Sequence, residues 1–161
     1  MYTGFIRSES DAMPPELHDM PGHLIRRAQQ FSNALFAEEC GGFDLTSVQY
    51  AALHAIAAQD GIDATRLSAM IAFDRSTIGD VLERLESKGW ITRAASRADK
   101  RIKSVHLSKA GRQLLDDVAP AVARVQRRLL VVLPVGEQAA ALAILRKLAG
   151  AADLTEQGGP G

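Results

Sequence analysis

The sequence predicts a mainly α-helical fold with one small β-hairpin. Apolar residues recur every three or four positions over most of the chain, whereas residues 90–108 have apolar positions typical of two strands around a polar turn. The 161 residues are 47% hydrophobic and 24% charged, which suits one globular domain. No apolar run approaches the roughly 18 residues that span a bilayer, and no secretory leader is recognisable. We therefore expect a cytoplasmic protein without a membrane span.

The N-terminal part predicts an arm followed by one long helix. Residues 1–15 contain glycine, proline and serine without periodicity, so we expect a flexible N-terminal arm. From about residue 16, apolar side chains recur at intervals of three, four or seven, and this pattern ends at Gly41 and Gly42. A helix with such a stripe needs a partner surface. The stripe consists of Leu17, Leu24, Ala28, Phe31 and Leu35.

Two further helices are predicted from their capping residues. Thr46 and Gln49 have the spacing of a capping box, which predicts a helix over about 47–58. Asp60 and Gly61 then form a turn, and Asp63 is placed to cap a short helix. Its inward-facing residues are expected to be Leu67 and Met70.

The next segment predicts a turn, a helix and the hairpin. Ala72 and Phe73 form a tight turn, Asp74 caps the helix, and Gly89 ends it. The hairpin follows, with Trp90 and Ile91 starting one strand and Ile102, Val105 and Leu107 pointing inward from the other.

Two long helices complete the predicted fold. Ser108 caps a helix over about 109–132, in which Pro120 is expected to introduce a kink. After Pro134 a last helix spans about 137–149. The glycine-rich residues 150–161 predict a flexible tail.

Charge is unevenly distributed, although the chain is neutral overall with 19 basic and 19 acidic residues. Residues 1–65 hold three bases and nine acids, a balance of −6, and residues 66–112 hold eleven bases and five acids, a balance of +6. A sequence-specific DNA reader needs only a local basic face. The segment 66–112 is therefore the candidate nucleic-acid surface.

Helix, turn, helix and basic hairpin, in this order, form a winged helix-turn-helix. Its second helix presents the first turn to base edges, and the hairpin touches phosphate or the minor groove. Arg75 can pair with guanine through two hydrogen bonds, and Ser76 and Thr77 can bond base edges or phosphate. A basic turn alone is more often simply solvated, so the preceding helix pair is what favours DNA. Further candidate contacts are Arg84, Arg97, Asp99, Lys100, Arg101 and Lys103.

Four segments together resemble the MarR family of transcriptional regulators, over about residues 20–149. They are LTSVQ at 45–49, DRSTIGDVLERLESKGWITR at 74–93, SRADKRIKSVHLSKAG at 96–111 and LPVGEQAAALAILRKL at 133–148. The resemblance implies a homodimer with a helical dimerisation region (16–42 and 109–149) and a winged helix-turn-helix domain (45–107) that reads half of a palindromic operator. It also implies wing roles for Asp99 and Arg101. Many relatives have a basic residue where this chain has Asp80, so the base preference of relatives does not transfer.

Apolar helical stripes at both ends of the chain favour a dimer on physical grounds as well. A monomer of this size cannot easily bury both stripes and hold a separate winged domain. Twofold symmetry would present two recognition helices to neighbouring turns of the major groove. The candidate interface residues are Leu17, Leu24, Leu142 and Leu145.

The resemblance also implies a small-molecule effector, commonly an aromatic acid bound between the two regions. Such a pocket needs a cation or imidazole for the carboxylate and an apolar or aromatic wall. The candidates are His23, Arg26 and Arg27 on the first long helix, and Tyr50 and His54, which share one face of the next. The alternative is that the arginines are solvated or paired with Glu38, Asp19 or a neighbouring chain, and that Tyr50 and His54 bond a local carbonyl.

The run HLIRRAQQFSNALFAEE, at 23–39, is similar to family members that govern catabolism of aromatic or heteroaromatic carboxylates, including nicotinate-pathway repressors. This similarity makes a hydroxylated aromatic or pyridine carboxylate the first candidate effector. We expect release of a repressor from its operator.

Other functions receive weaker support. A redox sensor would use Cys40, but this thiol follows two glutamates near the negative end of a helix. A metal sensor would need converging ligands, and His18, His23, His54 and His106 are scattered. The acidic first third disfavours a constitutive architectural DNA-binding protein. No nucleophile elbow, HExxH, Walker or dinucleotide motif occurs, so we expect neither an enzyme nor a cofactor.

Overall fold

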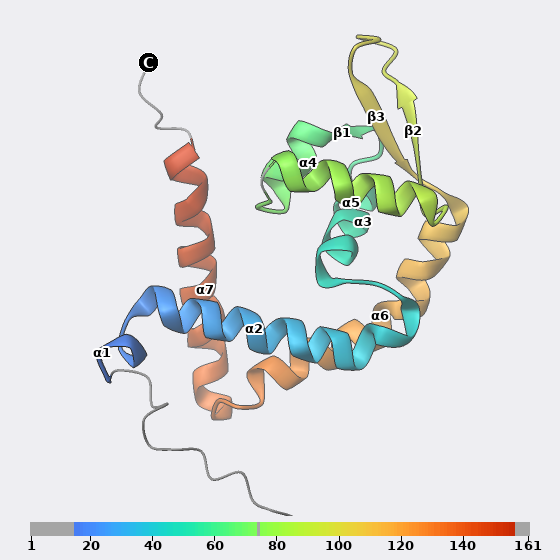
Figure 1. Cartoon of the computed structure of the whole chain (residues 1–161). Helices are drawn as coiled ribbons and strands as arrows, with labels where there is room; N and C mark the ends of the chain where they lie inside the picture. Colours follow the sequence, from blue (N-terminus) through green and yellow to red (C-terminus); the bar gives the residue numbers. More distant parts are fainter. Residues whose placement is uncertain (1–14, 74, 157–161) are drawn as a thin grey trace, which may run out of the picture.

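The computed structural model describes residues 15–73 and 75–156 (Figure 1). The predicted arm over 1–14, the predicted cap Asp74 and residues 157–161 lie outside the described residues. The elements are α1 (Pro15–His18), α2 (Pro21–Cys40), a 3₁₀ turn (Gly41–Phe43), α3 (Ser47–Ala58), β1 (Ile62–Asp63), α4 (Ala64–Met70), α5 (Arg75–Ser87), β2 (Ile91–Ala95), β3 (Lys103–Leu107), α6 (Lys109–Leu130) and α7 (Val135–Glu156).

Helices α3 to α5 and a small sheet form the winged part of the molecule. The hairpin of β2 and β3 is confirmed, with Ile91 opposite Leu107 and Ala95 opposite Lys103. The sheet nevertheless has a third strand that the sequence analysis missed, since β1 pairs antiparallel with β3 in the order β1-β3-β2. Asp63 belongs to this strand and also caps α4, because its carboxylate accepts a hydrogen bond from the Arg66 amide at 2.9 Å.

The other predicted caps are present. Thr46 and Gln49 exchange hydrogen bonds of 3.1 and 3.2 Å across the first turn of α3, a complete capping box. Ser108 caps α6 by accepting a hydrogen bond from the Gly111 amide at 3.0 Å. A side chain at Gly111 would place its Cβ 2.1 Å from the Trp90 carbonyl oxygen, so only glycine lets α6 start this close to the wing.

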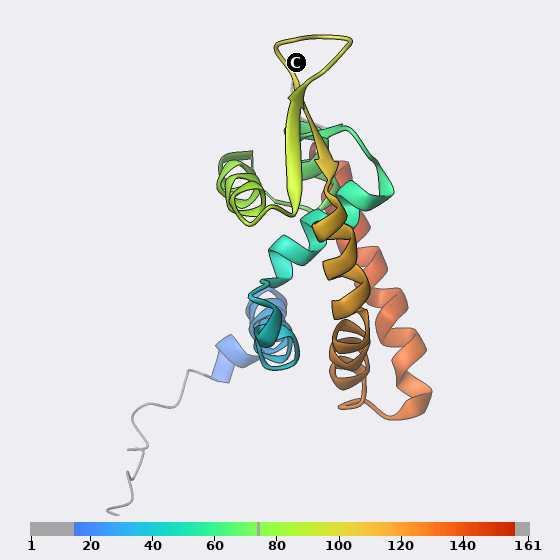
Figure 2. The same cartoon turned by 90° about the vertical axis from the view of Figure 1, so that its right-hand side faces the viewer.

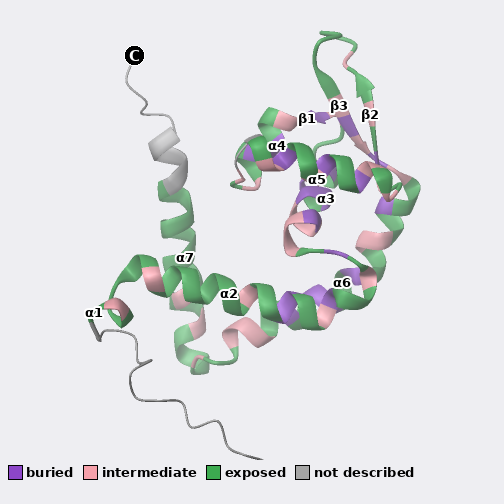
Figure 3. Ribbon diagram, viewed as in Figure 1, coloured by how far each residue is buried: buried purple, intermediate pink, exposed green. Residues whose placement is uncertain are grey.

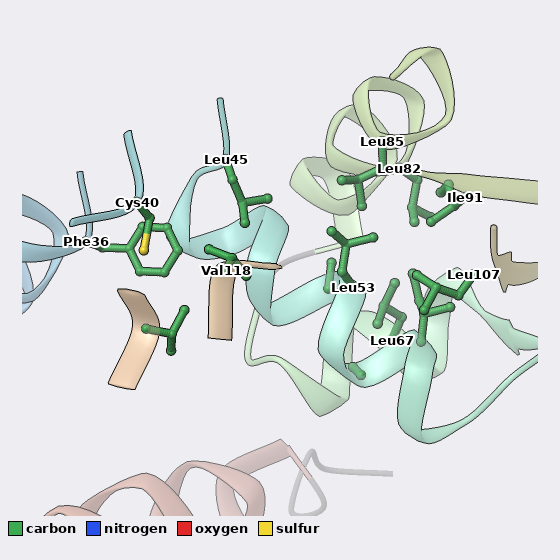
Figure 4. Close-up of a cluster of buried hydrophobic side chains, with 14 of the residues drawn as sticks. Phe36, Cys40, Leu45, Leu53, Leu67, Leu82, Leu85, Ile91, Leu107 and Val118 are labelled. Carbon is green, nitrogen blue, oxygen red and sulfur yellow. The ribbon is translucent and has the colours of Figure 1, made fainter. Parts of the chain in front are cut away.

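One continuous hydrophobic core joins the winged part to the helices below it (Figure 4). Met70 was predicted to face inward, but it is 47% exposed because it ends the short helix α4, whereas Leu67 is fully buried. Ile102 was also predicted to face inward, but it precedes β3 and is 45% exposed. The largest fully buried side chains include Leu53, Ile56, Leu67, Ile78, Leu82, Leu85, Ile91, Val105, Val118 and Val125.

The predicted helix from residue 16 is divided into two. The chain leaves α1 after His18 and starts α2 at Pro21, where the ring fits the first turn because its missing N–H has no helical partner there. The C-terminal half of α2 lies along α6 and buries Leu35, Phe36 and Cys40. Ion pairs reinforce this contact, since Arg124 Nε lies 2.6 Å from a Glu39 carboxylate oxygen.

The N-terminal half of α2 and residues 135–151 of α7 differ from this core, because they are almost wholly exposed (Figure 3). Between Val135 and Ala151 only Gln138 and Ala141 are even half-buried. Helix α7 is also longer than predicted, since it starts at Val135 and continues through Gly150 to Glu156. Residues 150–156 are therefore helical rather than part of a loose tail.

In the described parts of the chain, no single helix is long and apolar enough to cross a membrane. Only α6 and α7 taken together, which meet at a bend of 105°, reach that length and composition.

Candidate nucleic-acid interface

Helix α5 exposes the face opposite its core residues. Ile78, Leu82 and Leu85 point into the core, so the helix is anchored along one side. On the first turn, Ser76 is exposed and Thr77 is half-buried. Arg75 begins the helix, and its side chain lies outside the described residues. Of the predicted base-reading turn, the described part thus exposes Ser76, at the start of a helix that is anchored along its other side.

The C-terminal end of α5 carries Arg84 and is followed directly by Lys88. Lys88 Nζ lies 2.9 Å from a carboxylate oxygen of Asp44 and 4.6 Å from the centre of the Trp90 ring, so its charge has partners within the chain. Arg84 is exposed and lines a cavity of about 620 Å³ together with Lys88 and residues of α2 and α3. Contact between Arg84 and DNA stays a prediction.

The wing projects beyond the helices, with α5 to one side of it (Figure 2). Its tip is closed by backbone hydrogen bonds from Ile102 to Asp99 at 3.0 Å and from Ser96 to Ile102 at 2.8 Å. Asp99 also accepts a hydrogen bond from the Arg101 amide at 2.9 Å, and the two side chains approach to 3.9 Å. Asp99 therefore orders the arginine of the tip. The predicted wing contacts are all exposed: Arg97, Asp99, Lys100, Arg101 and Lys103.

An ion pair that the sequence analysis missed connects α5 to the wing. Arg93 on β2 donates through Nε to a carboxylate oxygen of Glu86 at 2.8 Å. The hydrogen bonds from Arg93 hold the pKa of Glu86 below its usual value. Because Arg93 uses its charge on Glu86, its first role is to fix the wing relative to the recognition helix.

His106 makes a second unforeseen link, from β3 to the turn before β1. Its Nδ1 lies 3.0 Å from Asp60 and its Nε2 lies 3.0 Å from the Ser104 hydroxyl. The same hydroxyl donates to the Ala94 carbonyl at 3.2 Å. These contacts tie the sheet to the end of α3.

The two groups of predicted effector residues do not meet within one chain. Tyr50 and His54 lie with ring centres 5.8 Å apart and line a cavity of about 440 Å³ with residues of α3, α4 and Ile71, but no residue of α2. His23 packs edge-on to His18 at 6.2 Å, on the first turn of α2. The exposed Arg26 and Arg27 form no ion pair with a described residue, which agrees with the alternative of solvated side chains and not with pairing to Asp19 or Glu38.

His23 has one unusual feature. Its Nε2 is shielded from solvent and has no hydrogen-bond partner among the described residues. A shielded polar atom without a partner is uncommon and needs an explanation.

Cys40 and the scattered histidines are the residues considered for alternative sensor sites. Cys40 is fully buried, and burial raises the pKa of its thiol, with the neighbouring Glu39 acting in the same direction. Among the residues that the structure describes, no three histidine, cysteine, aspartate or glutamate side chains are placed to hold a metal ion.

The candidate interface leucines lie on the exposed helical layer. Leu24 is 48% exposed, Leu142 38% and Leu145 54%, and Leu17 is half-buried. Large apolar side chains are rarely left this exposed over a contiguous patch. Neighbouring exposed residues are Met20, Ile25, Phe31, Val131, Val132, Val135, Ile144 and Leu148.

Taken together, a helix pair whose second helix is anchored along one side and a projecting basic hairpin define a winged helix-turn-helix protein of the DNA-binding class. Residues 43–102 match the MarR family. The transcriptional repressor NicR of Pseudomonas putida is 30% identical over 138 residues, which cover 86% of this chain and 87% of NicR. The chain belongs to the MarR family of transcriptional regulators.

Solved structures of related proteins agree with this assignment. The regulator PcaV of Streptomyces coelicolor in complex with its natural ligand is 32% identical, covers 88% of this chain and 99% of PcaV, and superposes with a TM-score of 0.76. Bordetella bronchiseptica BpsR, whose DNA binding is regulated by 6-hydroxynicotinic acid, is 28% identical, with 85% and 98% coverage and a TM-score of 0.78. E. coli MarR bound to operator DNA is 26% identical, with 84% and 99% coverage and a TM-score of 0.77. These relatives are transcriptional regulators rather than enzymes.

Proposed function

We propose that this chain is a homodimeric repressor that leaves a palindromic operator when a small aromatic or heteroaromatic carboxylate binds. The observation that carries the proposal is the unpartnered helical layer of α2 and α7. A layer of this kind calls for a second copy, and a second copy supplies a second recognition helix.

Dimerisation is supported by the apolar side chains that α7 leaves exposed. Leu142 and Leu145 lie one turn apart on α7, and Leu24 and Ile25 expose similar side chains on α2. Each leucine or isoleucine gains roughly 1.5 to 3 kcal/mol when it moves from water into a fully apolar contact. A symmetric pairing of these surfaces would bury both stripes at once.

Binding of a carboxylate is supported by the charges at the start of α2. Arg26 and Arg27 have no ion-pair partner among the described residues, and the shielded Nε2 of His23 lacks a hydrogen bond. An arginine can bind a carboxylate through two parallel hydrogen bonds. In a dimer, the cavity at Tyr50 and His54 would supply the aromatic wall if the second copy brings its own α2 toward it.

The named relatives support the chemical class of this effector. The DNA binding of BpsR is regulated by 6-hydroxynicotinic acid, and PcaV was solved with its natural ligand. NicR is a repressor, which supports repression rather than activation.

The test is a fluorescence-anisotropy titration of the protein on duplex DNA from its own promoter, at fixed salt. The titration is repeated with benzoate, 4-hydroxybenzoate, nicotinate and 6-hydroxynicotinate. We expect one dimer to bind each operator and one of the acids to weaken binding at least tenfold. Tight binding that no acid changes would contradict the effector, and would favour a constitutive DNA-binding protein.

Two arginine variants separate the effector site from the DNA surface. Arg26→Ala with Arg27→Ala should retain operator binding and lose the response to the acid, because the carboxylate loses its cation. Arg146→Ala is the matched control, since it removes an exposed positive charge from α7 and should keep the response. Loss of operator binding in the Arg26 and Arg27 variant would show that these residues do not serve the effector alone.

A further inference from the structure

A basic cleft lies between the start of α4, helix α5 and the wing. Its volume is about 500 Å³. Four of its lining residues are basic and only one is acidic, so the cleft suits an anion. The basic residues are Arg66, Arg93, Arg101 and Lys103, and the acid is Asp63.

Not all of these charges are available to a ligand. Arg93 is held by Glu86 at 2.8 Å, and Arg101 faces Asp99 at 3.9 Å. The carboxylate of Asp63 is turned to the first turn of α4, where it accepts the Arg66 amide at 2.9 Å. Arg66 and Lys103 are exposed and form no ion pair with a described residue. They are the cations of the cleft without an ion-pair partner among the described residues, although the charge of Lys103 also acts on Glu86 and helps to lower the pKa of that carboxyl.

The position of the cleft identifies the anion. When a recognition helix enters the major groove and a wing reaches the adjacent minor groove, the sugar–phosphate backbone that separates the two grooves runs between helix and wing. The cleft occupies this place, since Leu82 of α5 lines one side and Arg101 to Lys103 of the wing line the other. Figure 2 shows α5 to one side of the wing.

We propose that the cleft binds one backbone phosphate of the operator, with Arg66 from α4 and Lys103 from the wing as its two cations. The proposal rests on DNA binding by this surface and adds a contact from α4, an element outside the recognition helix and the wing. A contact of this kind fixes the position of the protein on the duplex and carries no sequence information of its own. It therefore adds affinity and helps to hold the protein on the duplex without changing which bases are preferred.

The first test is the salt dependence of operator binding. Each phosphate contact contributes about −0.9 to the slope of log affinity against log salt concentration, so a fourfold rise in salt weakens the wild type about 3.5-fold more than a variant lacking one contact. We expect this difference for Arg66→Ala, with the order of preferred operator sequences unchanged. Arg66→Lys should keep most of the slope because it keeps the charge. Arg127→Ala is the control, since it removes an exposed arginine from the last turn of α6, outside the basic segment 66–112, and should leave the slope as in the wild type.

The second test locates the phosphate. Single phosphates of the operator are replaced in turn by uncharged methylphosphonates, and binding is measured for the wild type and for Arg66→Ala. We expect one position, between the bases read by α5 and the minor groove at the wing, where the replacement weakens the wild type but not the variant. An Arg66→Ala protein that keeps the wild-type salt slope and responds equally at every position would overturn the contact.

These outcomes separate the contact from the proposed function. Absence of wild-type binding to promoter DNA would overturn the repressor and the phosphate site together. Wild-type binding with an unchanged Arg66→Ala variant overturns only the phosphate site. A third outcome uses inorganic phosphate at millimolar concentration and constant ionic strength as a competitor for labelled DNA. If phosphate displaces the DNA equally from the wild type and from Arg66→Ala, Arg66 makes no contribution to phosphate binding and the inference fails.

Discussion

The winged part of the molecule and its outer helical layer differ in where their apolar side chains go. In the winged part, Leu53, Leu82 and Ile91 are all but fully buried within their own chain. On α7, by contrast, Leu142, Leu145 and Leu148 remain exposed. The difference teaches that one chain is enough to bury the apolar side chains of the winged part, whereas those of the outer layer need a further surface to cover them.

The C-terminal half of α2 marks the boundary between the two regions. Phe36 and Cys40 are buried in the common core, but Leu24 and Phe31, earlier on the same helix, are exposed. One helix thus carries both kinds of surface. This helix and its contacts with α6 therefore connect the outer layer to the winged part.

The largest effect is expected when charged side chains replace exposed apolar residues of α7. Leu142→Glu with Leu145→Glu would place two carboxylates in the proposed dimer contact, where burying an unpaired charge is costly. We expect a monomer in sedimentation equilibrium. Binding to a two-half-site operator should weaken by roughly 100-fold or more, because linkage of two binding modules raises avidity by about 10² to 10⁴.

Ala143→Glu is the control for this variant, since it adds a carboxylate to the opposite side of α7. It should remain dimeric. A stable dimer in the doubly charged variant would mean that α7 does not form the contact.

The second prediction compares one substitution in the two regions. Leu53→Ala should lower the free energy of unfolding by about 2 to 5 kcal/mol, because it leaves a cavity in a closed core. Leu145→Ala should leave the core intact and make the melting temperature more sensitive to protein concentration, since dimer formation is weakened. Calorimetry at two protein concentrations checks both. If both variants lower the melting temperature equally and independently of protein concentration, the two regions do not differ in this way.

Sequence reasoning located the elements whose ends depend on near neighbours. The capping box of Thr46 and Gln49 joins residues three apart, and the Ser108 cap joins Ser108 to Gly111. Both are visible as spacing in the sequence. The hairpin was also found, because its strands and its turn are consecutive.

Features that depend on distant residues were missed. Strand β1 has two residues and exists only because Ile62 pairs with Val105. The link between Asp60 and His106 spans 46 positions. The Glu86 and Arg93 pair could have been suspected, since opposite charges flank the helix end seven positions apart, but only the fold brings them into contact.

Helix α7 shows how a local rule can mislead. Glycine costs about 1 kcal/mol in a helix relative to alanine, which suggested an end at Gly150. The residues on either side are alanines, the best helix formers, and the helix continues to Glu156. Summed propensity over several residues outweighs one unfavourable position.

The third prediction separates two kinds of contact within the winged part. Arg75→Ala should weaken operator binding by roughly 1 to 3 kcal/mol and relax base choice, because a base-reading hydrogen-bond pair is lost. Arg101→Ala should weaken binding to all sequences and lower the salt slope by about 1, because the exposed wing tip contacts phosphate. Anisotropy titrations on the operator and on scrambled DNA distinguish the two. If neither variant binds differently from the wild type, the DNA surface has been assigned to the wrong residues.

The smallest expected effect concerns the joint between the two regions, which is the contact of Glu39 on α2 with Arg124 and Arg128 on α6. Hydrogen bonds from Arg124 and then Arg128 hold the pKa of Glu39 below its ordinary value of 4.5. The folded state therefore binds this proton less readily than the unfolded state, so the contribution of Glu39 to stability is present above pH 4.5 and is lost as the pH falls further. Glu39→Gln lacks the contribution at every pH. In urea unfolding, the difference in the free energy of unfolding between the wild type and Glu39→Gln should be largest near neutral pH and should disappear below pH 4.5. Glu137→Gln, on the exposed α7, should show no such difference. A gap that persists unchanged at low pH would mean that Glu39 stabilises the joint through packing rather than through its charge.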